Sequence, residues 1–132
     1  MTDTQRLVLR LEAGGRFELI EWPRPGDNTL TTLLAAIGCC AVDAVDISED
    51  LTMWLDDEGI ITGQPVNWGA TALYAAHRPP HQKYHGTVVI TGGTDRHGDT
   101  LPLTTDQITE IIEFHCTAGE SFIPRQRDHR GV

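Results

Sequence analysis

Three histidines spaced by four residues are the first candidates for chemistry: His77, His81 and His85. On a continuous helix their imidazoles would lie on one face, and imidazole is a common zinc ligand. Pro79 and Pro80 stand between them and prevent that helix. Zinc would also need a fourth ligand from elsewhere in the chain. We therefore predict a solvated loop here, with no metal site and no cofactor.

Cysteines are the second candidates. Cys116 is a conceivable nucleophile, with His115 or His97 as its general base. Cys116 lies near the end of an amphipathic segment, however, so a packed thiol is expected. Cys39 and Cys40 begin an apolar stretch after a predicted helix end, and we expect both to be buried and reduced.

The remaining motifs give no catalytic residue. Asp56 and Asp57 form a carboxylate pair, but they fall on a predicted turn with nothing to shield them from water. Residues 92–94 (GGT) could offer N–H groups to a phosphate, although such a sequence is more typical of a turn. There is no nucleophile elbow, Walker-type loop or dinucleotide fingerprint. We therefore expect a protein that is not an enzyme.

Acidic residues dominate the charge of the chain. The 132 residues contain 19 Asp and Glu against 10 Lys and Arg, for a net charge of −9. Such a surface repels nucleic acid and anionic membranes and attracts basic partners. Seven acids fall within residues 43–58 with no basic residue among them: Asp43, Asp46, Glu49, Asp50, Asp56, Asp57 and Glu58. We predict that they gather at one edge as an interaction surface, with plain solubility as the alternative.

The acidic stretch also predicts the effect of mutation. Replacing Asp56, Asp57 and Glu58 with Asn or Gln should leave the fold intact or slightly more stable, because like charges that repel one another do not stabilise it. The same change should weaken binding to a basic partner, and salt should weaken binding as well.

Hydrophobic patterning predicts the elements that position these residues. Strands are expected over 6–12, 16–22, 39–47, 51–55, 60–62 and 86–91, and the first should be half-buried, with alternate leucines on one face. Helices are expected from a cap at Asp27 or Asn28 to Ile37, over 68–76 after a cap at Asn67, and from a capping box at Thr104 to Gly119. Gly38 suits the end of the first helix.

These elements predict a single α+β domain over residues 1–119. We expect a mixed or antiparallel sheet of about five to six strands, packed by two to three helices. Residues 120–132 read as a polar, basic C-terminal tail. Without an apolar span or a signal-like start, the expected location is cytoplasmic.

Five pieces in a fixed order resemble a known family. They are residues 53–59 (MWLDDEG), 63–67 (GQPVN), 70–73 (ATAL), 86–92 (GTVVITG) and 103–108 (LTTDQI). The chain resembles the family called domain of unknown function 3846, which bacteriophages and other mobile elements carry, over roughly residues 6 to 115. The resemblance implies a phage setting and a small accessory role, and it implies no catalytic residue.

Two functions of different classes fit these features. The first is a non-catalytic phage protein for host takeover or anti-defence, whose acidic face binds a host protein with a basic surface. The second is a sponge for a small nucleotide signal, which stacks on aromatic rings and holds phosphate with basic residues. The possible ligand-binding residues are Trp54, Asn67, Trp68, Arg78, Tyr84 and Arg96, with Lys83 as a further phosphate contact. A homodimer is left open, and direct nucleic-acid or membrane binding is not expected.

Overall fold

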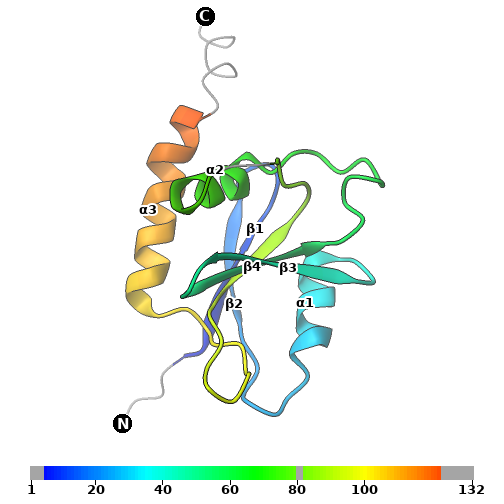
Figure 1. Ribbon diagram of the computed structural model, residues 1–132, viewed down its shortest axis with the longest axis vertical. Helices are drawn as coiled ribbons and strands as arrows, with labels where there is room; N and C mark the ends of the chain where they lie inside the picture. The colour runs from blue at the N-terminus through cyan, green and yellow to red at the C-terminus, as the bar shows by residue number, and fades with distance from the viewer. Residues whose placement is uncertain (1–4, 80–81, 123–132) are drawn as a thin grey trace, which may run out of the picture.

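The computed structural model describes residues 5–79 and 82–122. In chain order, the elements are β1 (Leu7–Leu11), β2 (Phe17–Glu21), α1 (Thr29–Ile37), β3 (Val42–Ser48), β4 (Leu51–Asp56), α2 (Trp68–His77), β5 (Val88–Gly92) and α3 (Thr105–Phe122) (Figure 1). None of the helices in these residues is both long and apolar enough to cross a bilayer.

The five strands form one antiparallel sheet in the order β2-β1-β5-β4-β3. The last strand in the sequence, β5, lies between the β1–β2 and β3–β4 hairpins. Its residues Val88, Val89 and Ile90 are fully buried, as expected for an apolar run in the centre of a sheet. The predicted α+β domain is confirmed, and its sheet is antiparallel.

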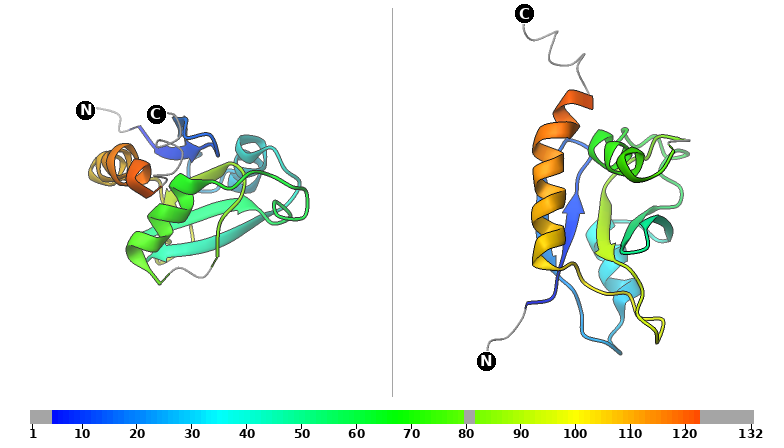
Figure 2. Two further views of the ribbon diagram at one scale, coloured as in Figure 1. Left: turned by 90° about the horizontal axis from the view of Figure 1, so that it is seen from above. Right: turned by 60° about the vertical axis from the view of Figure 1, so that its left-hand side comes forward.

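Helices cover both faces of the sheet: α2 and α3 lie on one face and α1 on the other (Figure 2). Strand alternation therefore sends Leu9 and Leu11 into the core under α2 and α3, while Val8 packs with Leu33 under α1. Arg10 is on the α1 side too, and its Nε donates to the carbonyl of Ala36 at 2.8 Å. The prediction that the first strand is covered on one face only is thus wrong.

Residues 60–62 do not form the predicted strand. They belong to a turn over 57–63, in which the N–H of Thr62 donates to the carbonyl of Glu58 at 2.9 Å. The predicted strand over 39–47 begins later, at Val42, because Gly38 ends α1 in the left-handed conformation and the chain must then turn. The last helix passes Gly119 and continues to Phe122. Residues 123–132, most of the predicted tail, lie outside the described residues.

The prediction of buried cysteines is wrong for two of the three thiols. Cys40 lies exposed in the turn between α1 and β3, and Cys116 lies exposed on α3. Cys39 is half-buried, and its Sγ donates to the carbonyl of Ala41 at 3.3 Å. Burial, and secondarily the negative charge of Asp56, raise the pKa of the Cys39 thiol. It is therefore a weaker nucleophile at neutral pH than an ordinary exposed cysteine.

Candidate functional site at the acidic end of the sheet

The β3–β4 hairpin forms one edge of the sheet and carries the seven acids. They divide between its two ends, which are roughly 20 Å apart for strands of this length. One end is the tight turn, with Asp46, Glu49 and Asp50. The other is the open end, where Val42 pairs with Asp56; we call Asp43, Asp56, Asp57 and Glu58 the acidic end. The acids therefore lie along one edge of the sheet, as predicted, but in two separate groups, because an antiparallel hairpin separates its turn from its open end.

The carboxylates of the acidic end have no cationic partner within the described residues. The salt bridges found among the described residues lie at the other side of the sheet, where Arg10 pairs with Glu12 at 2.7 Å and with Glu18 at 3.4 Å. Asp43, Asp57 and Glu58 are exposed. Their negative charge is thus balanced by solvent ions, and a basic partner could replace those ions.

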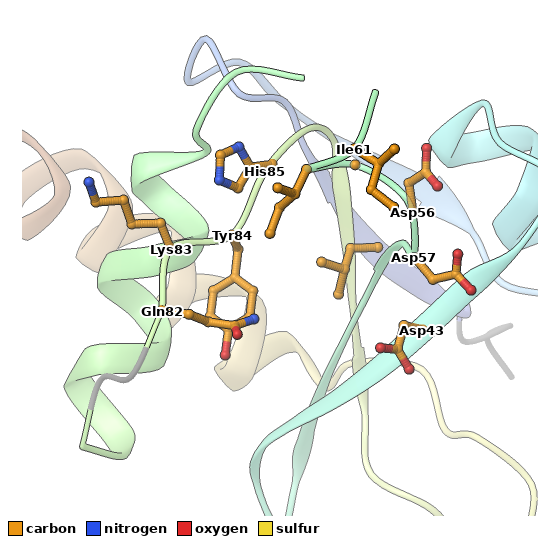
Figure 3. A pocket seen from close by; sticks show the side chains of 11 residues that line it. Asp43, Asp56, Asp57, Ile61, Gln82, Lys83, Tyr84 and His85 are labelled. Carbon is orange, nitrogen blue, oxygen red and sulfur yellow. The ribbon is translucent and has the colours of Figure 1, made fainter. Parts of the chain in front are cut away.

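A cavity of about 320 Å³ opens beside the acidic end (Figure 3). Asp43, Asp56 and Asp57 line one side of it. Lys83 and His85, from the connection between α2 and β5, line the other side. The side chain of Lys83 points away from these carboxylates, with its Nζ 5.4 Å from the ring centre of Trp68. The cavity lies at the surface between two loops.

Two isoleucines at the rim of this cavity are the most exposed large apolar side chains among the described residues. Ile60 is 65% exposed and Ile61 is 83% exposed. Their sequence pattern predicts a strand, which does not indicate this exposure. A usable signal was available, because an apolar run of two residues between Gly59 and Gly63 is too short for a typical strand.

Asp56 differs from the other acids because it holds the turn in place. Its Oδ1 accepts the N–H of Glu58 at 2.9 Å, and its Oδ2 accepts the side-chain amide of Gln64 at 2.8 Å. The carbonyl of Gln64 lies 2.9 Å from Nδ1 of His85 across the rim. Neutralising Asp56 would disturb these bonds, so the variant suggested by the sequence would mix folding with binding.

The possible ligand-binding residues do not converge on one site. Trp54 packs on the α1 face, where its Nε1 donates to Oγ1 of Thr91 at 3.0 Å. Trp68 begins α2 on the other face, where Nζ of Lys83 lies 5.4 Å from its ring centre. Arg96 is in the exposed loop that follows β5.

The other members of that set have structural roles or lie at the surface. Asn67 is fully buried and caps α2. Tyr84 is buried in the core, with its ring 5.3 Å from that of Tyr74. Arg78 is exposed at the C-terminal end of α2. Lys83 and Tyr84 both line the cavity beside the acidic end, whereas Trp54, Arg78 and Arg96 lie in other parts of the described chain.

The histidines are likewise separated by their own contacts. Nδ1 of His77 lies 3.1 Å from the carbonyl of Leu73, and Nε2 of His115 lies 2.8 Å from the carbonyl of Gly15. His81 lies outside the described residues. Within residues 5–79 and 82–122, no three His, Cys, Asp or Glu side chains are grouped closely enough to hold a metal ion.

A comparison with protein families identifies the chain. Residues 4–115 match the model described as domain of unknown function (DUF3846). The chain belongs to this family. No curated protein and no solved structure matches it. The resemblance that the sequence indicated is confirmed, and the family region includes the whole acidic end, both exposed isoleucines and Asn67.

The buried side chain of Tyr84, which lies in this family region, should lower the stability of the fold at high pH. Burial, with Tyr74 beside it, raises the pKa of Tyr84 from its ordinary value of 10.0 to about 12. The folded state thus favours the neutral phenol of Tyr84. The stability that depends on this neutral form is fully present below pH 10 and is lost as the pH rises through about 12. We expect urea unfolding to show a falling free energy of unfolding over that interval. Tyr84→Phe should flatten the fall, and an unchanged slope in this variant would contradict the assignment.

Proposed function

We propose that this protein is a non-catalytic binding protein whose acidic end docks on a basic surface of a host macromolecule. The observation that carries the proposal is the position of Ile60 and Ile61, which are strongly exposed beside carboxylates that have no cationic partner among the described residues. Protein interfaces commonly combine an apolar centre with a polar rim. The two side chains would form that centre, and Asp43, Asp57 and Glu58 would form the rim.

Each part of this surface has a separate physical role. Complete burial of an isoleucine side chain contributes roughly 1.5–3 kcal/mol, which would hold the complex together. The rim carboxylates would contribute less to affinity, about 0.2–1 kcal/mol each, but would speed encounter with a basic partner. Binding should therefore weaken as salt increases, without disappearing.

The setting proposed for this activity follows from the family. The resemblance of this chain to proteins that bacteriophages and mobile elements carry favours a bacterial host protein as the partner. The proposed role is host takeover or anti-defence in the host cytoplasm, by occupation of a basic surface. The spread of Trp54, Tyr84 and Arg96 over separate parts of the fold favours this role over a nucleotide sponge.

A pair of charge-matched variants tests the proposal. The first is Asp43→Asn/Asp57→Asn/Glu58→Gln, which leaves Asp56 in place. Asn at position 43 retains an oxygen that can accept the N–H of Ala44, as Asp43 does at 3.1 Å. We expect roughly tenfold weaker capture of a bacterial partner, since three rim charges together contribute on the order of 1–2 kcal/mol. The measurement is quantitative pull-down from lysate at low salt, followed by titration of the captured protein.

The matched control is Asp46→Asn/Glu49→Gln/Asp50→Asn, at the turn end of the same hairpin. It changes the net charge by the same amount. If the position of the charges matters, it should reduce capture less than about twofold. Equal losses in both variants would show that only net charge acts. A third variant, Ile60→Ser/Ile61→Ser, should reduce capture even at high salt. Circular dichroism on all three confirms that the fold is retained.

A further inference from the structure

The two edges of the sheet, β3 and β2, both carry exposed acids but differ in their outward backbone groups and in their register. At the β3 edge, the outward N–H of Ala44 is already bonded to Oδ1 of Asp43 at 3.1 Å. Asp46 adds a further charge, and the strand register shifts between Asp46 and Ser48. Charged side chains and irregular register are the devices that keep an edge from pairing with another strand.

The β2 edge has open backbone groups instead. Its ladder with β1 is bounded by bonds from the N–H of Glu12 to the carbonyl of Arg16 and from the N–H of Trp22 to the carbonyl of Arg6. Bonded and non-bonded pairs alternate in an antiparallel ladder. The backbone N–H and C=O groups of Phe17, Leu19 and Glu21 therefore point away from β1. In the described part of the chain, nothing else pairs with them.

Apolar side chains accompany this open edge. Phe17 is 38% exposed and Leu19 is 41% exposed. Both lie opposite Leu11 and Leu9 of β1, on the face that carries α3. The side chain of Phe17 also packs edge-on against His115 of α3, with ring centres 5.8 Å apart. The edge is thus a regular strand with partly exposed apolar residues on one face.

We propose that β2 pairs antiparallel with β2 of a second copy, on a two-fold axis at Leu19, so that the two sheets become continuous. In this register Leu19 faces Leu19, and Phe17 faces Glu21 on each side of the axis. Every outward backbone group of the strand then has a partner, because the residues that point outward face one another. On the other face Glu18 is opposite Ile20, so like charges are not directly opposed, and Glu18 keeps Arg10 at 3.4 Å.

The choice of a second copy as the occupant follows from this self-complementarity. A C2 interface requires one surface to match itself, and the outward backbone groups of β2 do so about Leu19. The added interface is small, of the class below about 1,200 Å² that characterises weak complexes. We therefore expect a monomer–dimer equilibrium that favours the dimer only at high protein concentration.

Sedimentation equilibrium over a range of concentrations up to on the order of 1 mM, where a very weak complex still forms, tests the proposal. We expect the wild type to dimerise and Leu19→Lys, which places two like charges at the axis, to raise the dissociation constant at least about tenfold. Ala44→Lys, on the protected β3 edge, is the control and should not alter it. A wild type that remains monomeric, or a dimer that Leu19→Lys leaves intact, would overturn the proposal.

Cross-linking tests the register independently of stability. In a background with Cys39, Cys40 and Cys116 replaced by serine, Leu19→Cys should form a covalent dimer under mild oxidation. Facing residues in a bonded antiparallel pair have Cα atoms about 5.5 Å apart, which suits a disulfide. Phe17→Cys, which would face Glu21, should not cross-link. Cross-linking through position 17, or at neither position, contradicts this pairing.

Discussion

Replacement of Asn67 with alanine is expected to lower the free energy of unfolding by roughly 3 kcal/mol or more. The side chain is fully buried and bonds to three parts of the chain. Its Nδ2 donates to the carbonyls of Leu11 at 3.0 Å and Gly86 at 2.8 Å, and its Oδ1 accepts the N–H of Ala70 at 3.0 Å. Alanine would remove all three bonds from a buried site, and each buried polar group left without a partner costs about 1–3 kcal/mol.

Urea unfolding and thermal melting measure this effect, and a fall in melting temperature on the order of 10 °C is expected. Asn28→Ala is the matched control, since Asn28 caps α1 through one exposed bond to the N–H of Thr31 at 3.1 Å. Its expected cost is about 1 kcal/mol.

Asn67→Asp separates the two roles of the Asn67 side chain. Aspartate keeps an oxygen that can cap α2 but loses the amide that donates to Leu11 and Gly86. We expect it to destabilise at least as much as alanine, because its second oxygen would face two carbonyls. If Asn67→Asp were as stable as the wild type, the two donated bonds would contribute nothing and the interpretation would fail.

Replacement of Gly92 with alanine is expected to lower the free energy of unfolding by about 3 kcal/mol, the upper part of the range for overpacking. A Cβ at this position would lie 2.6 Å from the carbonyl oxygen of Pro102 and 3.1 Å from that of Leu101. Both neighbours are backbone atoms, so they cannot rotate away. The N–H of Gly92 also donates to the carbonyl of Leu101 at 2.9 Å, and the N–H of Leu103 donates to the carbonyl of Leu7 at 2.9 Å. These bonds hold residues 101–103 against the sheet.

The control for this prediction is Gly14→Ala. A Cβ on Gly14 would have nothing within 4 Å. Its effect should be within about 0.5 kcal/mol, as for most open surface positions. Denaturant unfolding of both variants gives the comparison, and a cost at Gly92 no larger than that at Gly14 would show that the segment can move aside.

The helix-capping signals in the sequence were reliable. Asn28 and Asn67 cap the helices that they were predicted to cap, and Gly38 ends the first helix with a φ of 81°. In the capping box, the N–H of Gln107 donates to Oγ1 of Thr104 at 3.0 Å, and the N–H of Thr104 donates to the side chain of Gln107 at 2.9 Å. These features depend on residues at most three positions apart, so the sequence alone contains their physical cause.

The family was also recognisable from the sequence, because its pieces follow one another in a fixed order along the chain. The α+β class followed from the alternation of strand and helix patterns. The conformation of residues 60–62 was mispredicted, since two isoleucines between turn residues have the composition of a strand. The shortness of the run argues against a strand, and the bonds that close the turn, such as the one from the N–H of Thr62 to the carbonyl of Glu58, establish the turn.

The tertiary structure alone decided where the charged and apolar surfaces lie. The sequence determined that seven acids are close together along the chain, but the hairpin register places Asp50 and Asp57 at opposite ends of β3 and β4. The sequence determined that residues 88–90 are apolar, but their place between two hairpins makes β2 and β3 the sheet edges. Both outcomes depend on which strands pair, and pairing is settled by burial between residues far apart in the chain, which no local pattern contains.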